Sequence, residues 1–66
     1  MVNKVKVTRV IKNIGQEELA KKVGVTRQAI HSIEKGKYQP SVILAFKIAK
    51  ALNIDINELF KLEEND

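Results

Sequence analysis

The most regular hydrophobic pattern in this chain runs from Gln16 to Glu34. Its first half repeats apolar residues on one helical face, namely Leu19, Ala20 and Val23. The positions around them are polar or charged, so this stretch predicts a short amphipathic helix with one buried face.

A turn and a second helix follow. Gly24 suits a sharp turn because glycine adopts a positive φ without a Cβ clash. Thr26 can then cap the next helix by accepting a hydrogen bond from a free backbone N–H. At 100° per residue, Ile30 and Ile33 face inward with Ala29 beside them. The pattern predicts two helices joined by a tight turn.

The outward face of the second helix carries hydrogen-bonding side chains almost throughout: Gln28, His31, Ser32 and Lys35, with Arg27 at the margin. Arginine can bond guanine O6 and N7 in a fork, and glutamine can bond adenine N6 and N7. This arrangement indicates a helix-turn-helix, in which the second helix lies in the DNA major groove. We expect Arg27 and Gln28 to read bases, followed by Ser32, with His31 at the groove edge. The alternative for each is contact with phosphates alone.

A longer set of residues extends this pattern: Gln16, Leu19-Ala20, Val23-Gly24-Val25, Ile30, Ile33-Glu34, Gly36, Pro40-Ser41, Ile48-Ala49, Leu52 and Leu59-Phe60. The set resembles the phage repressor/Cro-type (XRE-type) helix-turn-helix family from about Arg9 to Phe60. The resemblance implies an all-α fold, a five-helix repressor-like bundle, with residues 1–66 as one DNA-binding domain. Some short members of the family also pair their termini in a minimal two-stranded sheet, here Phe60-Lys61-Leu62 with Val2-Asn3.

Composition restricts the kinds of site and the classes of protein that the sequence can encode. The chain has no cysteine and only one histidine, so a disulfide framework and a thiolate or histidine metal site are excluded. The longest apolar run, Val42 to Phe46, is five residues, too short to span a membrane. The first residues lack a signal-peptide hydrophobic block, so the expected compartment is the cytosol. We expect no cofactor.

Charge is unevenly distributed. Residues 1–50 carry eleven Lys or Arg against three Glu, whereas residues 51–66 carry one Lys against five acidic residues. The basic part includes the helix-turn-helix, as a polyanionic partner requires. The alternative is that the lysines only keep a small protein in solution.

The segment from Val2 to Lys12 is ambiguous. Its valines alternate partly with polar residues, which would suit a strand, and valine is a poor helix former. The resemblance implies a first helix over about Lys4 to Lys12, with residues 1–3 extended, and we favour the helix. It also implies that Arg9 pairs with Glu34 in a largely buried ion pair; the alternative is two solvated charges. After this helix, Asn13 tolerates a left-handed conformation, and Gly15 replaces the usual hydroxyl cap.

Several residues are candidates for phosphate contacts: Gln16, Thr26, Lys35, Lys37 and Tyr38. Gln16 resembles a family position that touches the DNA backbone at a helix N-terminus. The two lysines lie in the loop 35–40 after the recognition helix, where phosphate contacts would fix the register. Tyr38 could instead pack beneath the loop, and the sequence does not decide between these roles.

In the last third of the chain, the hydrophobic pattern predicts two further helices. Ser41 caps the first, Val42 to Ala51, whose core stripe is Leu44, Ile48 and Leu52 with Ala45 and Ala49. Ile43 and Phe46 fall outside this stripe, so they form either a dimer contact or a surface that the last helix covers. Asp55 and Glu58 form a capping-box pattern for a short fifth helix through Leu59-Phe60. Residues 63–66 should fray.

We conclude that the sequence encodes a sequence-specific duplex DNA-binding transcriptional regulator, a repressor binding a roughly palindromic operator as a homodimer. The first alternative is an antitoxin-like module that mainly holds a second protein through Ile43 and Phe46. The second is an RNA-binding or purely structural bundle. Ser32 and His31 have no carboxylate placed to orient the imidazole, so we expect no catalysis.

Overall fold

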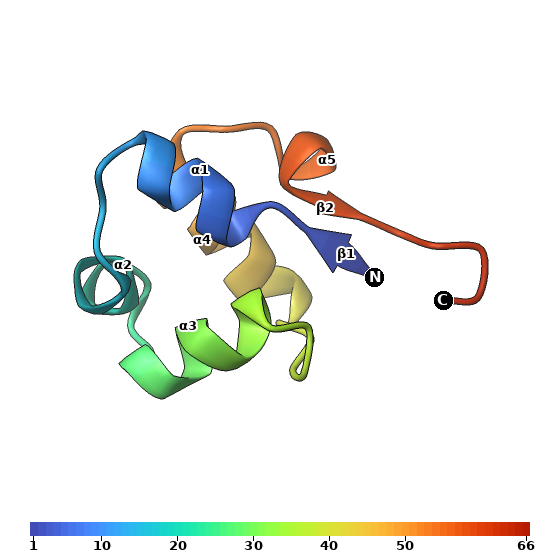
Figure 1. Cartoon of the computed structure of the whole chain (residues 1–66), viewed down its shortest axis with the longest axis horizontal. Helices are drawn as coiled ribbons and strands as arrows, with labels where there is room; N and C mark the ends of the chain where they lie inside the picture. The colour runs from blue at the N-terminus through green and yellow to red at the C-terminus, as the bar shows by residue number, and fades with distance from the viewer.

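The computed structural model describes all residues, 1–66, as five helices and a two-stranded antiparallel sheet (Figure 1). The elements in order are β1 (Val2–Asn3), α1 (Val5–Ile11), α2 (Gln16–Val23), α3 (Arg27–Glu34), α4 (Val42–Leu52), α5 (Ile56–Leu59) and β2 (Phe60–Lys61). The five-helix bundle is therefore confirmed, and so is the pairing of the termini, with Val2 opposite Lys61 and Asn3 opposite Phe60. Leu62 lies beyond β2, so the second strand is one residue shorter than expected. No helix is both long and apolar enough to cross a membrane.

The ambiguous N-terminal segment is a helix. Val5, Thr8 and Arg9 lie on the buried side of α1, while Val7 and Val10 are about half exposed. This spacing of three and four residues is helical, so packing of one face overrides the weak helix propensity of valine.

Asn3 connects the start of α1 to the end of α3, a role that the sequence reading missed. Its Oδ1 accepts a hydrogen bond from the Val5 N–H at 3.1 Å, and its Nδ2 donates to the Ile33 carbonyl at 2.9 Å. Asparagine side chains commonly accept a hydrogen bond from the backbone N–H two residues later, and this was the available sequence signal.

The turns around α2 and α3 follow the sequence expectations. Asn13 is left-handed with φ 61°, and Gly15 begins α2 in an extended conformation without a side-chain cap. Gly24 ends α2 with φ 78°. Thr26 Oγ1 then accepts from the Ala29 N–H at 3.1 Å and caps α3.

One contiguous core of eleven buried hydrophobic residues holds the helices together: Val5, Leu19, Ala20, Val23, Ile30, Ile33, Leu44, Ile48, Ala49, Leu52 and Leu59. Every helix contributes to it. The alternative that the last helix covers Ile43 and Phe46 is wrong, because their side chains remain 69% and 56% exposed.

The C-terminal part differs from expectation in two places. Ser41 and Asp55 cap α4 and α5 as expected, but α5 ends at Leu59, because Phe60 pairs with Asn3 in the sheet. No side-chain bond from Glu58 completes the capping box.

The last residues are also not frayed in the structure. Met1 and Asp66 lie close together because the sheet brings the two termini side by side, and the Met1 amine is 2.6 Å from Asp66 Oδ2. The Glu63 N–H donates to the same carboxylate at 2.7 Å.

The turn at Gly24 yields a stability prediction. Alanine at position 24 must adopt a left-handed conformation, so Gly24→Ala should lower the free energy of unfolding by roughly 1–2 kcal/mol in urea titration. Gly24→Asn is the matched control, because asparagine adopts the left-handed conformation more readily than alanine, as Asn13 and Asn53 do in this chain, and it should cost clearly less. Equal losses for both variants would contradict a specific conformational demand at Gly24.

Candidate nucleic-acid interface

Helix α3 presents one apolar face to the core and one polar face to solvent. Ile30 and Ile33 are fully buried. Arg27, Gln28 and His31 are exposed on the other side. Lys35 caps the helix end and is exposed as well, and Ser32 is partly buried. The expected outward face is therefore free of the rest of the chain, except where Gln16 reaches it.

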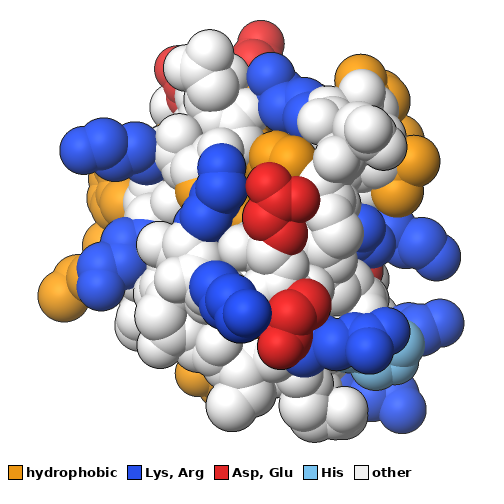
Figure 2. Space-filling model, turned by 90° about the vertical axis from the view of Figure 1, so that its left-hand side faces the viewer, with side chains coloured by type: hydrophobic (Ala, Val, Ile, Leu, Met, Phe, Trp, Pro, Cys, Tyr) orange, Lys and Arg blue, Asp and Glu red, His pale blue; other side chains and the backbone are white.

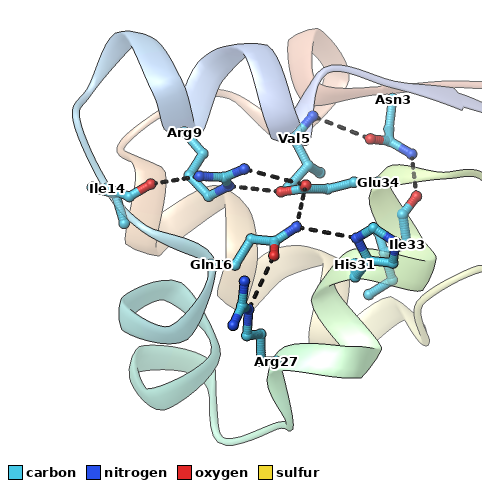
Figure 3. A network of polar contacts seen from close by, with 9 residues as sticks. All are labelled: Asn3, Val5, Arg9, Ile14, Gln16, Arg27, His31, Ile33 and Glu34. Carbon is cyan, nitrogen blue, oxygen red and sulfur yellow. Dashed lines mark hydrogen bonds and ion pairs between the residues drawn. The ribbon is translucent and has the colours of Figure 1, made fainter.

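The expected pair between Arg9 and Glu34 is present and joins α1 to α3 (Figure 3). Arg9 Nε lies 2.7 Å from Glu34 Oε2, and Arg9 Nη2 lies 3.3 Å from Oε1. The side chains are only 11% and 3% exposed. Arg9 Nη1 also donates to the Ile14 carbonyl at 2.9 Å, so the guanidinium fixes the connection between α1 and α2 as well.

Gln16 links this buried pair to the exposed face of α3. Its Nε2 donates to Glu34 Oε1 at 3.0 Å and lies 3.4 Å from His31 Nδ1. Its Oε1 accepts from Arg27 Nε at 3.2 Å. Figure 3 shows the amide between the three side chains.

Sequence reasoning missed this network. Arg27, His31 and Glu34 recur at i, i+4 and i+7, so they share one edge of α3. The helix that packs against this edge in a helix-turn-helix begins at Gln16. These two facts together could have predicted the contact.

The pKa of Glu34 lies below its ordinary value. Burial of the side chain favours the neutral acid, but hydrogen bonds from Arg9 and Gln16 and the charges of Arg9 and Lys6 favour the carboxylate more strongly. Glu34 is therefore held as an anion inside a cationic and hydrogen-bonding environment.

The edges of the outward face are polar and basic. A hollow of about 390 Å³ is lined only by Gln16, Arg27, Gln28 and His31. In Figure 2, which looks onto the side of the molecule where α2 lies, Lys and Arg side chains gather around the one histidine at the lower right. Such a surface suits an anionic ligand with polar edges.

The loop after α3 supplies further exposed groups. Lys35, Lys37 and Tyr38 all reach solvent, and Gly36 turns the chain with φ 75°. Tyr38 is 49% exposed, so it is not packed away beneath the loop.

Comparison with known proteins identifies the family. A helix-turn-helix family model matches residues 6–59. The chain belongs to the XRE-type helix-turn-helix transcriptional regulators. It is 53% identical to an uncharacterized HTH-type transcriptional regulator of Methanocaldococcus jannaschii over the full length of both chains.

Solved structures share the fold of this XRE-type regulator. One is the restriction-modification controller protein C.AhdI from Aeromonas hydrophila, with a TM-score of 0.81 and 33% identity over 86% of each chain. Another is the N-terminal DNA binding domain of SinR from Bacillus subtilis, with a TM-score of 0.79 and 27% identity over 92% of this chain and 90% of that one.

The lowered pKa of Glu34 gives the regulator a defined acid sensitivity. Glu34 ionises more readily in the folded state than in the unfolded chain, so its contribution is fully present above the ordinary pKa of 4.5 and is lost as the pH falls through the lower folded pKa. At neutral pH, removing one partner of such a buried pair costs on the order of 3–5 kcal/mol.

Urea unfolding of the parent and of Glu34→Gln, measured from about pH 7 to about pH 3, tests this expectation. The stability difference between them should be largest at neutral pH and shrink below pH 4.5. Parallel pH profiles for the two proteins would mean that Glu34 does not carry the effect.

Proposed function

We propose that this regulator binds duplex DNA as a homodimer, reads a roughly palindromic operator and represses transcription by occluding a promoter. The observation that carries the proposal is the exposed polar face of α3, mounted on a buried apolar face and flanked by basic residues. Two such helices would enter successive major grooves about 34 Å apart. The neighbouring structure that is titled a DNA binding domain has the same fold.

Within this proposal, Arg27 and Gln28 read base edges, with Ser32 and His31 as further contacts. Ser32 is the least accessible of the four, because it is partly buried. Lys35, Lys37, Tyr38 and Thr26 contact phosphates around the recognition helix. The Gln16 amide nitrogen faces Glu34 and His31, so a phosphate near α2 would be met mainly by the backbone N–H groups at the helix start.

The dimer is proposed to form through the apolar surface that includes Ile43 and Phe46. Phe46 also borders a hollow of about 330 Å³ in which only Asn57 has a polar side chain; the residues that line it are Met1, Pro40, Val42, Ala45, Phe46, Ile56, Asn57, Phe60 and Leu62. In Figure 1 this region, around α5 and β2, lies on the side of the molecule opposite α2. An apolar surface that no part of the chain covers suits an interface.

The same surface also supports the second candidate function, an antitoxin-like module that holds a different protein. The two candidates differ in the free protein. A homodimeric repressor is dimeric alone and selects a symmetric DNA sequence. A partner-binding module is monomeric alone and has weak affinity for DNA. Selection of bound sites from random duplexes, combined with light scattering, separates them.

Substitutions on the recognition helix and on its loop should have different effects on DNA binding. Gln28→Ala should relax the preference at one base pair by about 1–3 kcal/mol, whereas Lys37→Ala should weaken all sequences alike. With eight phosphate contacts per dimer, a plot of the logarithm of the binding constant against the logarithm of the salt concentration should have a slope of about −7. Gel shifts on matched and mutated duplexes at several salt concentrations provide the measurement. A complex insensitive to salt would contradict groove binding.

A charge placed on the apolar surface should dissociate the dimer. Ile43→Glu would bury an unpaired carboxylate in the interface, so the dimer dissociation constant should rise at least about tenfold, which corresponds to about 1.4 kcal/mol. Ile11→Glu is the matched control, because Ile11 is 77% exposed on α1, outside this surface. Sedimentation should show a monomeric Ile43→Glu variant and a dimeric control. If both variants stay dimeric, the interface lies elsewhere.

A further inference from the structure

Two charged neighbours fix the orientation of the Gln16 amide. Its nitrogen faces the Glu34 carboxylate at 3.0 Å, and its oxygen faces the Arg27 Nε–H at 3.2 Å (Figure 3). Reversing the amide would put oxygen against a carboxylate and NH₂ against an N–H donor. Both contacts would then be repulsive, so chemistry assigns the amide as drawn.

This orientation determines the chemistry of His31. The Gln16 nitrogen lies 3.4 Å from His31 Nδ1, and an N–H donor needs an acceptor opposite it. A neutral imidazole has one N–H and one bare nitrogen. The bare nitrogen must therefore be Nδ1, and the hydrogen must be on Nε2, the other ring nitrogen.

We propose that His31 is a specificity-determining residue that offers a hydrogen-bond donor, Nε2–H, to a base acceptor in the major groove, and that Gln16 is the positioning residue that fixes this tautomer. The inference rests on the proposed function, in which the outward face of α3 enters the groove. Guanine is the preferred base, because its N7 and O6 are adjacent acceptors. Cytosine is disfavoured at the same place, since it presents the N4 amino donor.

The surroundings of His31 support a donor role. Arg27 and Lys35 lie one helical turn before and after it and are exposed. Together with His31 they form an edge made only of donors. The nearby carboxylate, Glu34, is 3% exposed and is engaged by Arg9 and Gln16, so it does not present an acceptor to the DNA.

The tautomer can be measured without DNA. Nitrogen-15 NMR of the neutral imidazole, recorded at alkaline pH, should show Nδ1 unprotonated in nearly all molecules of the parent protein. Gln16→Ala should raise the Nδ1–H population. Gln16→Met keeps the length of the side chain but removes the N–H donor, so it should raise this population as well. A parent protein with Nδ1–H as the main form, or variants without any change, would overturn the assignment.

The base contact needs a second measurement. Duplexes that carry each of the four base pairs at every position of the selected half-site are titrated with the parent, with His31→Ala and with Gln28→Ala as the control. At one position the parent should prefer guanine by about 2- to 10-fold, as expected for a single hydrogen bond. His31→Ala should lose this preference alone, and Gln28→Ala should keep it.

The outcomes are distinguishable. If His31→Ala weakens every duplex equally, His31 contacts phosphate and the base-reading inference is wrong. If the parent binds no duplex, the proposed function fails and the base contact fails with it, whereas the tautomer measured by NMR would remain.

Discussion

The buried pair of Arg9 and Glu34 is the interaction on which the rest of the site depends. The two side chains connect α1 to the end of α3, and Arg9 also bonds the Ile14 carbonyl between α1 and α2. Burying two charges has a large desolvation cost, so such a pair is weak evidence for stability by itself. The pair instead fixes geometry, because Glu34 orients Gln16 through a hydrogen bond. An apolar pair of equal volume would fill the space without orienting Gln16.

The size of the chain makes such constraints important. A 66-residue chain has a small core, here eleven residues, and small domains bury a low fraction of their surface. Short polar connections supplement the core at its edge. Asn3 bonds both the start of α1 and the end of α3, and the β1–β2 pairing holds the termini together. These contacts restrain α3 at its C-terminal end, while the Thr26 cap and the turn at Gly24 define its N-terminal end.

Local sequence rules predicted most of the fold. Periodicity identified α2, α3 and α4, and glycine and hydroxyl residues marked their ends, because these signals act within a few residues. The first helix required the family resemblance, since the valines at positions 5, 7 and 10 also suit a strand and only packing of Val5 and Arg9 decides between the two. The sequence expectation for α5 runs one residue too far, to Phe60, because the pairing of Phe60 with Asn3 is a contact across almost the whole chain and leaves no local signal.

For the candidate site, the sequence predicted which residues face outward but not how their side chains are connected. Exposure of Arg27, Gln28 and His31 follows from helical geometry and the buried positions of Ile30 and Ile33. The Gln16 contacts depend on the crossing of α2 and α3 and on side-chain rotamers, which periodicity does not specify.

The hydrogen bonds around Gln16 also affect how tightly Arg27 can bind DNA in the proposed complex. A free arginine side chain loses about 2 kcal/mol of rotamer entropy when it is held in one position. Gln16 already holds Arg27 through Nε, which leaves the two terminal nitrogens free to form a fork toward guanine. In the proposed complex, part of the ordering of Arg27 is therefore complete before DNA arrives, and a larger share of each hydrogen bond contributes to affinity. Because Gln16 is held in turn by Glu34 and Arg9, this preorganisation originates in the buried pair.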